Sequence, residues 1–367
     1  MSRILRAEQG REVESQSVTR PFIRAAAAIL IIGGAAGAAF LLFQVASGAW
    51  DPVFSSLTPR LTDVVRRVVA KTQSSTILSP YFYVGVLGLF VAERLIPARD
   101  RQGLLSPGVL QDVIWFVVNT VPLSTVVFLY AALLEAFYKQ YLGFLTIDAV
   151  AAWSPASRLV MFLLVTDFLG WFHHFVRHKV EVFWYFHTIH HSQREMNMFT
   201  DHRVHVVEFV VASTLVFIPS LMFQLSTVSL GYFLIFLRWY TRIYHANLKS
   251  NFGFLKHVLV TPQSHRIHHS IERRHFDKNF GVFLTVWDRL FGTLYTNYDE
   301  YPDTGISDED FPVAAGSGRL RSLAGYWAQT VYPFGLLRAR FARARAAKTA
   351  LPGTSAAAVS RHPAGQV

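Results

Sequence analysis

Histidine is the residue type in this sequence whose number and spacing point most directly to chemistry. Of the fifteen histidines in the 367 residues, fourteen lie between His173 and His275. Three short motifs in that stretch repeat spacings of three or four residues: HFVRH begins at His174, HTIHH at His187 and HRIHH at His265. Side chains spaced in this way share one face of a helix. Because imidazole binds iron, zinc, copper and nickel, the motifs indicate a metal site.

The number of histidines in these motifs predicts two metal ions rather than one. A catalytic zinc ion typically uses three protein ligands and a water molecule, and the three motifs hold eight imidazoles. The chain contains no cysteine, which excludes thiolate zinc sites, iron–sulfur clusters, disulfides and thiol nucleophiles. Each ligating imidazole also needs a partner for its second ring nitrogen. Nearby candidates for that role are Asp167, Glu208, Asp277 and Asp288.

The sequence gives less reason to predict the other histidines as metal ligands. His173 is adjacent to His174 but points about 100° away from it on a helix, so we leave it out. His202 stays open between a ligand and an ordinary polar residue. Three histidines have no partner at ligand spacing, and we interpret them as ordinary polar residues: His257, His275 and His362.

The elements that carry the motifs are predicted to be membrane helices. The chain is 52% hydrophobic and only 16% charged, whereas typical soluble domains have about 25% charged residues. Runs of about 20 apolar residues, the length that crosses a bilayer as a helix, occur at residues 22–45, 77–97, 109–133, 158–175 and 206–240. Pro219 and a polar patch at 224–227 interrupt the last run, which predicts two helices joined by a hairpin. We expect an all-α integral membrane protein with about four to six transmembrane or re-entrant helices.

The positions of lysine and arginine predict the orientation of these helices. Four arginines precede the first apolar run and a fifth, Arg24, lies among its first residues, and cytoplasmic segments carry an excess of such residues. The N-terminus and the histidine motifs are therefore expected on the cytoplasmic side. The basic residues within 48–76 depart from this rule. A signal peptide is the alternative for residues 22–45, but about 20 polar residues precede the run and its apolar core is longer than that of a signal peptide. The net charge of +11 on so apolar a chain suits anionic lipid, and we expect no nucleic-acid partner.

Several sequence blocks together resemble one known family. The blocks are DFLGWFHHFVRH, FTDHRVHVVE, YHANLKSNFG, TPQSHRIHHS, DKNFGVFLTVWDRLFGTLY and YPDTGI, with HTIHH between the first two. They resemble the fatty acid hydroxylase / sterol desaturase superfamily over about residues 105–335. The resemblance implies a multi-pass integral membrane di-iron oxygenase whose cytoplasmic cap holds the metals, and we expect it in a bacterial inner membrane.

The resemblance also implies a ligand set and cofactors. The cofactors would be two Fe²⁺ ions, which zinc could replace on expression, with O₂ as co-substrate. His205 and His245 stand in blocks where relatives also keep a histidine, so we add them to the eight motif histidines. The implied ligands are His174, His178, His187, His190, His191, His205, His245, His265, His268 and His269.

The sequence departs from its relatives in places, and these departures bear on coordination. Many relatives have proline where this chain has Val206, and some hydroxylases have a further histidine where it has Thr241. The predicted division is a membrane-anchoring region with two spans at 1–104, a catalytic domain at 105–335 and a basic, disordered tail at 336–367. Residues 1–104 show nothing of a fused cytochrome domain, so we expect a separate electron-transfer protein of the ferredoxin, cytochrome b5 or reductase type.

The favoured function is O₂-dependent hydroxylation, or desaturation, of a C–H bond in a lipid, sterol or fatty-acyl substrate. Such a bond has no acidic proton, so acid–base catalysis alone cannot break it. A histidine-lined metal transporter is one alternative, but it would place its polar residues at mid-bilayer depth, and here they gather at one end of the spans. A zinc-dependent membrane hydrolase is another, but neither an HExxH nor a GxSxG motif is present.

Overall fold

The computed structural model describes residues 80–312 and 319–349, except residues 101, 104–105 and 121. The chain divides into two compact units, Met1–Lys71 and Thr72–Val367, and the described residues all belong to the second. The predicted span at 22–45, the basic loop at 48–76 and the last part of the tail lie outside the described residues.

The described part of the chain is helical and contains no strand, which agrees with the expected all-α class. Short 3₁₀ and π turns join the helices. The α-helices are α3 (Pro80–Leu95), α4 (Pro107–Thr120), α5 (Pro122–Phe137), α6 (Pro155–Lys179), α7 (Glu181–His191), α8 (Val206–Met222), α9 (Thr227–His245), α10 (Pro262–His268), α11 (Val286–Leu290) and α12 (Arg319–Thr349).

The helix boundaries follow local signals in the sequence. The apolar run at 109–133 forms two helices, because the proline that starts α5 lacks the N–H group needed to continue a helix. The run at 206–240 forms α8 and α9 joined by a tight turn, as predicted. Ser226 caps α9 by accepting a hydrogen bond from the Ser229 N–H, and Gln224 in the turn adopts a positive φ of 50°. Within the predicted tail at 336–367, the basic first part is helical, because α12 continues through residues 336–349, where alanine, arginine and leucine favour a helix.

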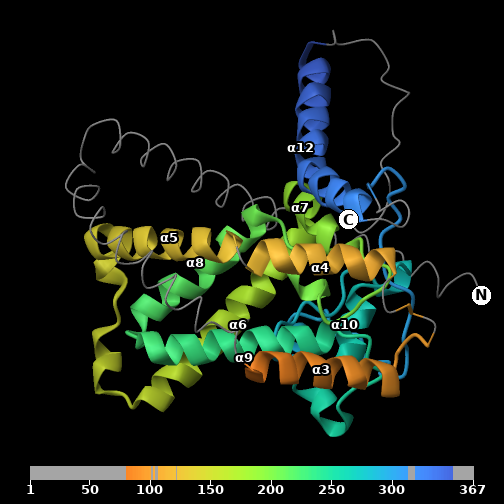
Figure 1. Cartoon of the computed structure of the whole chain (residues 1–367). Helices are drawn as coiled ribbons and strands as arrows, with labels where there is room; N and C mark the ends of the chain where they lie inside the picture. The colour runs from red at the N-terminus through yellow and green to blue at the C-terminus, as the bar shows by residue number, and fades with distance from the viewer. Residues whose placement is uncertain (1–79, 101, 104–105, 121, 313–318, 350–367) are drawn as a thin grey trace, which may run out of the picture. The chain divides into compact units, whose positions relative to one another are not determined.

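The helices pack so that the ends of α6, α8 and α9 meet α7 and α10. α6 packs against both α7 and α8, α10 packs against α9, and α12 covers α4 and α7. In Figure 1, α3 and α9 run side by side while α6 and α8 cross the space between them and α5. Gly85 of α3 lies directly against the ring of Trp239, which brings α3 close to α9.

A buried polar network holds the loop between α7 and α8. Asp112 of α4 accepts hydrogen bonds from Arg203 Nη1 at 3.1 Å, Asn197 Nδ2 at 2.8 Å and Thr200 Oγ1 at 2.7 Å. The Arg203 Nε group also donates to the carbonyl of Ile189 in α7 at 3.1 Å. A buried ion pair is tolerated when its remaining polar atoms are satisfied in this way, and here the pair fixes the loop relative to α7.

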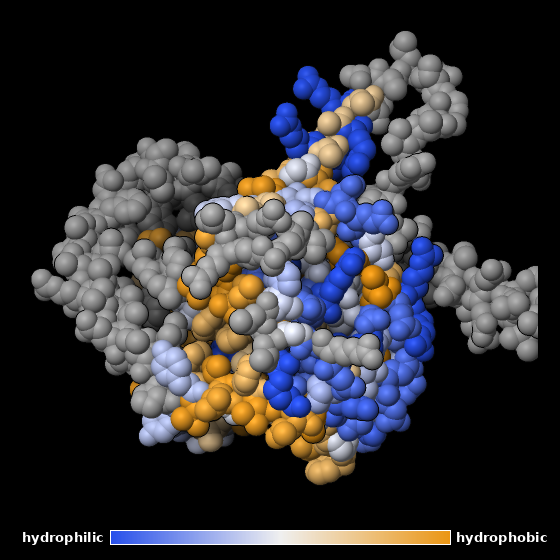
Figure 2. Space-filling model, turned by 45° about the vertical axis from the view of Figure 1, so that its right-hand side comes forward, coloured by the Kyte–Doolittle hydropathy of each residue, from blue (hydrophilic) through white to orange (hydrophobic). Residues whose placement is uncertain are grey.

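Apolar side chains remain exposed along several helices. Figure 2 shows apolar residues gathered on one part of the visible face and hydrophilic residues on the neighbouring part. The exposed apolar residues of α3, α8 and α9 include Tyr81, Val84, Leu87, Val91, Val206, Val207, Val211, Val228, Tyr232, Ile235 and Phe236. Surfaces of this kind serve membrane or protein contacts. Among the described helices, α6 alone is long and apolar enough to cross a membrane, and α8 is apolar but shorter; the predicted number of spans is not confirmed.

Candidate metal centre

Nine of the ten predicted ligand histidines converge in two neighbouring clusters. The five-histidine cluster contains His174, His178, His187, His191 and His268, and the four-histidine cluster contains His190, His245, His265 and His269. In each cluster the candidate ligand nitrogens all lie within 4.8 Å of one another, and every member is buried. The structure therefore offers two places where a metal ion could bind.

Each HxxHH motif serves both clusters. In α7, His187 and His191 join the five-histidine cluster, whereas His190 joins the other. At α10 the division is reversed, because His265 and His269 join the four-histidine cluster and His268 joins the five-histidine cluster. The pair spaced by four residues thus stays together, and the remaining histidine faces the neighbouring site.

Nitrogen–nitrogen distances within the clusters fit a shared ion. The Nε2 atom of His265 lies 2.8 Å from that of His245 and 3.1 Å from that of His269, and the His245 and His190 Nε2 atoms are 3.1 Å apart. Two nitrogens bound at about 2.1 Å to one ion are about 3.0 Å apart at a right angle and about 3.4 Å apart at the tetrahedral angle. The His178 and His191 Nε2 atoms in the five-histidine cluster are also 3.1 Å apart.

Backbone carbonyls orient three of the imidazoles. His174 Nδ1 lies 2.9 Å from the Phe280 carbonyl oxygen, His268 Nδ1 lies 2.8 Å from that of Lys278, and His245 Nδ1 lies 2.7 Å from that of Thr241. A carbonyl oxygen can only accept, so each Nδ1 carries the proton and each Nε2 keeps its lone pair. The Nε2 atoms of His174 and His268 are buried without a hydrogen-bond partner in the described part of the chain. A metal ion would satisfy them.

A carboxylate orients a fourth imidazole. Glu208 Oε1 lies 3.0 Å from His187 Nδ1 and accepts a hydrogen bond from Arg177 Nη1 at 3.2 Å. His187 Nε2, on the far side of the ring, is buried and has no hydrogen-bond partner among the described residues. Glu208 therefore occupies the orienting position predicted for it.

The other three predicted orienting carboxylates do not contact the clustered histidines. Asp167 accepts from the backbone N–H groups of Phe283 and Leu284, at 2.8 and 3.2 Å, and Asp277 pairs with Lys179. Asp288 acts indirectly: it accepts from the Phe280 N–H at 2.9 Å and so holds the residue whose carbonyl orients His174. Closeness in sequence suggested direct contact, but these carboxylates instead fasten the loop after α10 to α6.

Burial keeps the clustered imidazoles neutral. Desolvation is the largest cause and, helped by neighbouring cationic and imidazole groups, lowers the pKa of His187, His191 and His265 well below its usual value. Burial likewise lowers the pKa of His268 to about 3. Imidazole binds metal in its neutral form, so these residues are ready to ligate at neutral pH.

The structure does not bring His205, the tenth predicted ligand, to either cluster. His205 precedes α8 and caps it, because its Nδ1 accepts a hydrogen bond from the Val207 N–H at 3.1 Å. Its Nε2 lies 3.2 Å from the Thr330 carbonyl of α12. Both ring nitrogens are therefore engaged away from the clusters, and the matching sequence block is explained by a structural role.

The histidines left out of the ligand set have other surroundings. His202, left open by the sequence, pairs with Asp201 at 2.6 Å. His275 Nδ1 lies 2.8 Å from Ser270 Oγ, and His257 is exposed. His362 lies outside the described residues.

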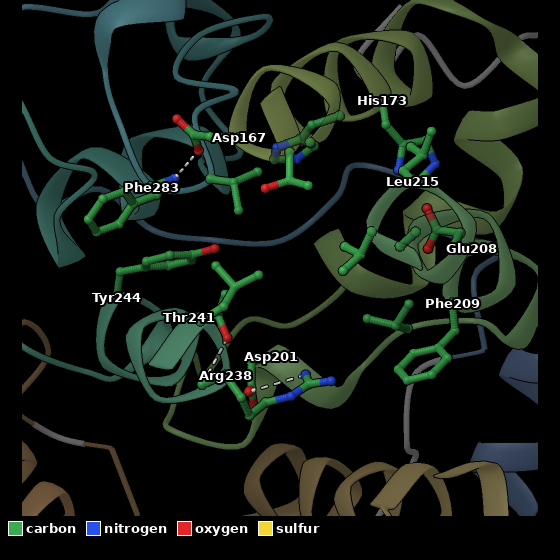
Figure 3. Close-up of a pocket in the computed structure, with 18 of the residues that line it drawn as sticks. Asp167, His173, Asp201, Glu208, Phe209, Leu215, Arg238, Thr241, Tyr244 and Phe283 are labelled. Atoms are coloured by element: carbon green, nitrogen blue, oxygen red, sulfur yellow. Dashed lines mark hydrogen bonds and ion pairs between the residues drawn. The ribbon is translucent and has the colours of Figure 1, made fainter. Parts of the chain in front are cut away.

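A cavity of about 240 Å³ opens beside both clusters. His174 and His187 of one cluster and His190, His245 and His265 of the other line it. In Figure 3, Glu208, Phe209 and Leu215 stand on one side of the cavity and Asp167, Phe283 and Tyr244 on the other. Most of the remaining wall comes from α6, α8 and α9, with Val204, Val282 and Phe283 from loops, and it is mostly apolar. Asp201, Arg238 and Tyr244 also line it, although no spacing pattern in the sequence distinguished them.

Comparison with known proteins adds independent evidence for the nature of this centre. Residues 159–293, which contain all nine clustered histidines, match the fatty acid hydroxylase family. The chain carries a fatty acid hydroxylase domain. This finding confirms the resemblance to the fatty acid hydroxylase / sterol desaturase superfamily. No solved structure matches the chain.

Characterised relatives of this fatty acid hydroxylase domain act on lipids. The chain is 33% identical to alkylglycerol monooxygenase of Homo sapiens over 144 residues, which are 38% of this chain and 31% of the relative. It is 29% identical to the Danio rerio enzyme over 265 residues, 68% of this chain and 53% of the relative. It is 27% identical to an ornithine lipid hydroxylase of Rhizobium tropici over 146 residues, 39% of this chain and 43% of the relative. The chain thus spans between about a third and a half of their length.

Replacing Glu208 with glutamine is expected to lower metal affinity by about 10-fold or more, the range seen when an outer partner of a ligating histidine is lost. Glutamine removes the charge that orients His187 and balances Arg177. Competition with a chromogenic chelator measures the effect. Glu135→Gln is the matched control, because Glu135 pairs with Lys139 on an exposed face of α5. Equal affinities in the two variants would contradict the orienting role.

Proposed function

We propose that this protein is a membrane-bound di-iron oxygenase that hydroxylates a C–H bond of a lipid. One observation carries the proposal: two adjacent, buried histidine clusters face one largely apolar cavity. The domain match and the lipid oxygenases among the relatives support it. The nine clustered histidines would hold the two ions, and His205 is not included.

Iron suits the donor set and the substrate. When bound, two iron ions supply the O₂ and one-electron chemistry that protein side chains lack. Hydroxylation then consumes one lipid C–H bond, one O₂, two electrons and two protons, and it yields the alcohol and one water. Zinc fits the same imidazoles but has no redox chemistry, so zinc-loaded protein would be inactive.

The residues of the chain perform the remaining tasks. The carbonyls of Phe280, Lys278 and Thr241 and the carboxylate of Glu208 fix the imidazole orientations. The apolar walls of the cavity bind the lipid and exclude water, which strengthens every electrostatic interaction inside it. The electrons come from a separate donor of the ferredoxin, cytochrome b5 or reductase type.

We propose hydroxylation as the reaction in preference to desaturation, although enzymes of both kinds occur in this superfamily. The sterol desaturase relative of Gibberella zeae is 26% identical over 173 residues, whereas the alkylglycerol monooxygenases and the ornithine lipid hydroxylase point to hydroxylation. Glycerol ether lipids and ornithine lipids are therefore the first substrates to test. We place the protein in a membrane with its histidine clusters on the cytoplasmic side, and in a bacterial inner membrane.

The alternatives fit the clusters less well. A catalytic zinc site typically uses three protein ligands with an open position, whereas these clusters offer four and five histidines. A transporter needs a polar path that continues through the membrane, whereas the far end of this cavity is lined by apolar residues such as Leu163, Val216 and Phe233.

The test combines metal analysis with oxygen labelling. Purified protein is expected to contain about two metal ions per chain, one for each cluster. Iron-loaded protein given a reduced ferredoxin, ¹⁸O₂ and a membrane lipid extract is expected to yield a lipid alcohol that carries one ¹⁸O atom. Zinc-loaded protein is the control. Iron-loaded protein that produces no O₂-dependent lipid product with any of the three donor types would refute the proposal.

A further inference from the structure

The cavity follows three helices over several turns. Its lining takes successive turns of α6 from Leu163 to His174, of α8 from Glu208 to Val216 and of α9 from Phe233 to His245. Leu163 and His174 are eleven residues apart, which corresponds to about 16 Å at about 1.5 Å per residue. This length matches half of the hydrocarbon core of about 30 Å, or one leaflet of alkyl chains. The cavity is therefore an elongated slot that ends at the histidine clusters.

The end of the slot far from the clusters offers no free polar group. Leu163, Leu215, Val216 and Phe233 line it. Polar residues do occur part-way along the slot, but their side-chain atoms are engaged. Thr166 donates to the Phe162 carbonyl at 2.7 Å. Asp167 accepts three hydrogen bonds, from Phe283 N, Leu284 N and Trp287 Nε1. An alkyl chain is the ligand that fits this end.

The end of the slot at the clusters offers free hydrogen-bond acceptors. Glu208 Oε2 and Asp201 Oδ2 are buried and have no hydrogen-bond partner in the described part of the chain. Both residues are 4% exposed and line the cavity. The nearest cations to Asp201 Oδ2 are Arg238 Nη1 at 3.7 Å, marked in Figure 3, and Arg242 Nη2 at 4.0 Å.

The charge on Asp201 defines the kind of group that would bind there. Burial acts to raise the pKa of Asp201, but His202 and the nearby arginines outweigh it and hold this pKa well below its usual range. Asp201 is therefore ionised at neutral pH. A carboxylate oxygen only accepts hydrogen bonds, so the matching ligand group carries an O–H or N–H donor.

The slot reaches the surface between apolar residues. Ala212 of α8 and Phe236 of α9 line the cavity and are also exposed. The exposed neighbours Val207, Val211 and Ile235 are apolar as well. A lipid can therefore pass sideways from a hydrocarbon environment into the slot between these apolar side chains, while Arg238, which also lines the cavity and has a 41% exposed side chain, lies on the same helix as Phe236.

We propose that the slot takes an amphiphile whose O–H or N–H donors adjoin a long unbranched alkyl chain, with the donors at Glu208 and Asp201 and the chain directed towards Leu163 and Phe233. The carbon presented to the histidine clusters then lies close to the polar group and not at the end of the chain. The choice of carbon rests on the proposed function of the clusters, whereas the direction of binding does not.

Photocrosslinking tests the direction of binding without any turnover. Zinc-loaded protein is incubated with hexadecylglycerol that carries a diazirine either at the chain terminus or at the carbon next to the ether oxygen. The terminal diazirine is expected to label peptides around Leu163 and Phe233, and the other to label peptides around Asp201 and Glu208. The reversed pattern, or the same pattern from both probes, would overturn the proposal.

A chain-length comparison tests the apolar end of the slot. Leu163→Trp is expected to weaken binding of hexadecylglycerol by about tenfold and to leave binding of octylglycerol unchanged, because only the longer chain reaches Leu163. Val160→Trp is the matched control, since Val160 lies on the same helix, is 57% exposed and does not line the cavity. Equal losses for both ligands, or no loss for either, would overturn the proposal. Correct labelling without any oxidised product would refute the oxygenase function alone.

Discussion

Replacing His265 with alanine is expected to empty the four-histidine cluster and to reduce lipid oxidation by more than about 100-fold, beyond the loss seen for outer partners. The Nε2 atom of His265 lies close to two other members of that cluster, 2.8 Å from His245 and 3.1 Å from His269. Removing it leaves three of the four imidazoles of the cluster. Under the proposed function both metal ions are needed, so loss of the ion from this cluster should abolish lipid oxidation.

The matched control for His265→Ala is His205→Ala, because the same family resemblance suggested both as ligands. His205 caps α8 and lies outside both clusters. His205→Ala should retain both metal ions and should cost about 1 kcal/mol of stability through the lost cap. Metal content by mass spectrometry, with activity on the same samples, measures the difference. If His205→Ala loses an ion and His265→Ala does not, the ligand set given by the geometry is wrong.

Replacing Asp288 with alanine is expected to destabilise the protein by at least about 1–3 kcal/mol, the cost of leaving a buried hydrogen-bond donor without its partner. Asp288 is 1% exposed. Its carboxylate accepts hydrogen bonds from Trp171 Nε1 at 3.0 Å, Phe280 N at 2.9 Å and Gly281 N at 2.8 Å. Alanine would leave these buried donors unsatisfied. Because the Phe280 carbonyl orients His174, metal affinity should fall as well.

The thermal unfolding midpoint in detergent measures this effect, together with chelator competition for metal affinity. Asp299→Ala is the control, because Asp299 lies in the same C-terminal loop region but is exposed. Asp288→Asn should retain part of the stability, since its amide oxygen still accepts hydrogen bonds. An unfolding midpoint for Asp288→Ala equal to that of the control would show that the loop does not depend on this carboxylate.

Most of the candidate metal centre could be predicted from spacing. Histidines four residues apart share a helix face, and such pairs stay together in the structure, as His174 with His178 and His265 with His269 do. The division of each HxxHH motif between two clusters also has a signal in the sequence. Adjacent histidines on a helix point about 100° apart. A helix that lies between two metal sites therefore presents one histidine of the pair to each site. That argument excluded His173 and applies equally to His190 and His191.

The orienting groups could not be predicted in the same way. Three of them are backbone carbonyls, of Thr241, Lys278 and Phe280, and every residue has a carbonyl. At position 241, where some hydroxylases have a further histidine, this chain has threonine and so lacks one possible ligand. The backbone carbonyl of Thr241 instead orients His245. Among four nearby carboxylates, only Glu208 contacts a clustered histidine, because the others fasten loops whose path sequence proximity does not reveal.

The sequence by itself determined the helical class, the imidazole side chains of the candidate metal centre and the identity of the nine histidines that cluster there. It could do so because helical periodicity and residue type are local properties. The tertiary structure alone decided which histidine joins which cluster, and it placed His205 elsewhere. It also decided that α6, α8 and α9 enclose a slot with an acceptor-rich end at the clusters and an apolar end beyond. These features depend on contacts between residues distant in the chain, such as Asp167 with Phe283, and no local pattern encodes such contacts.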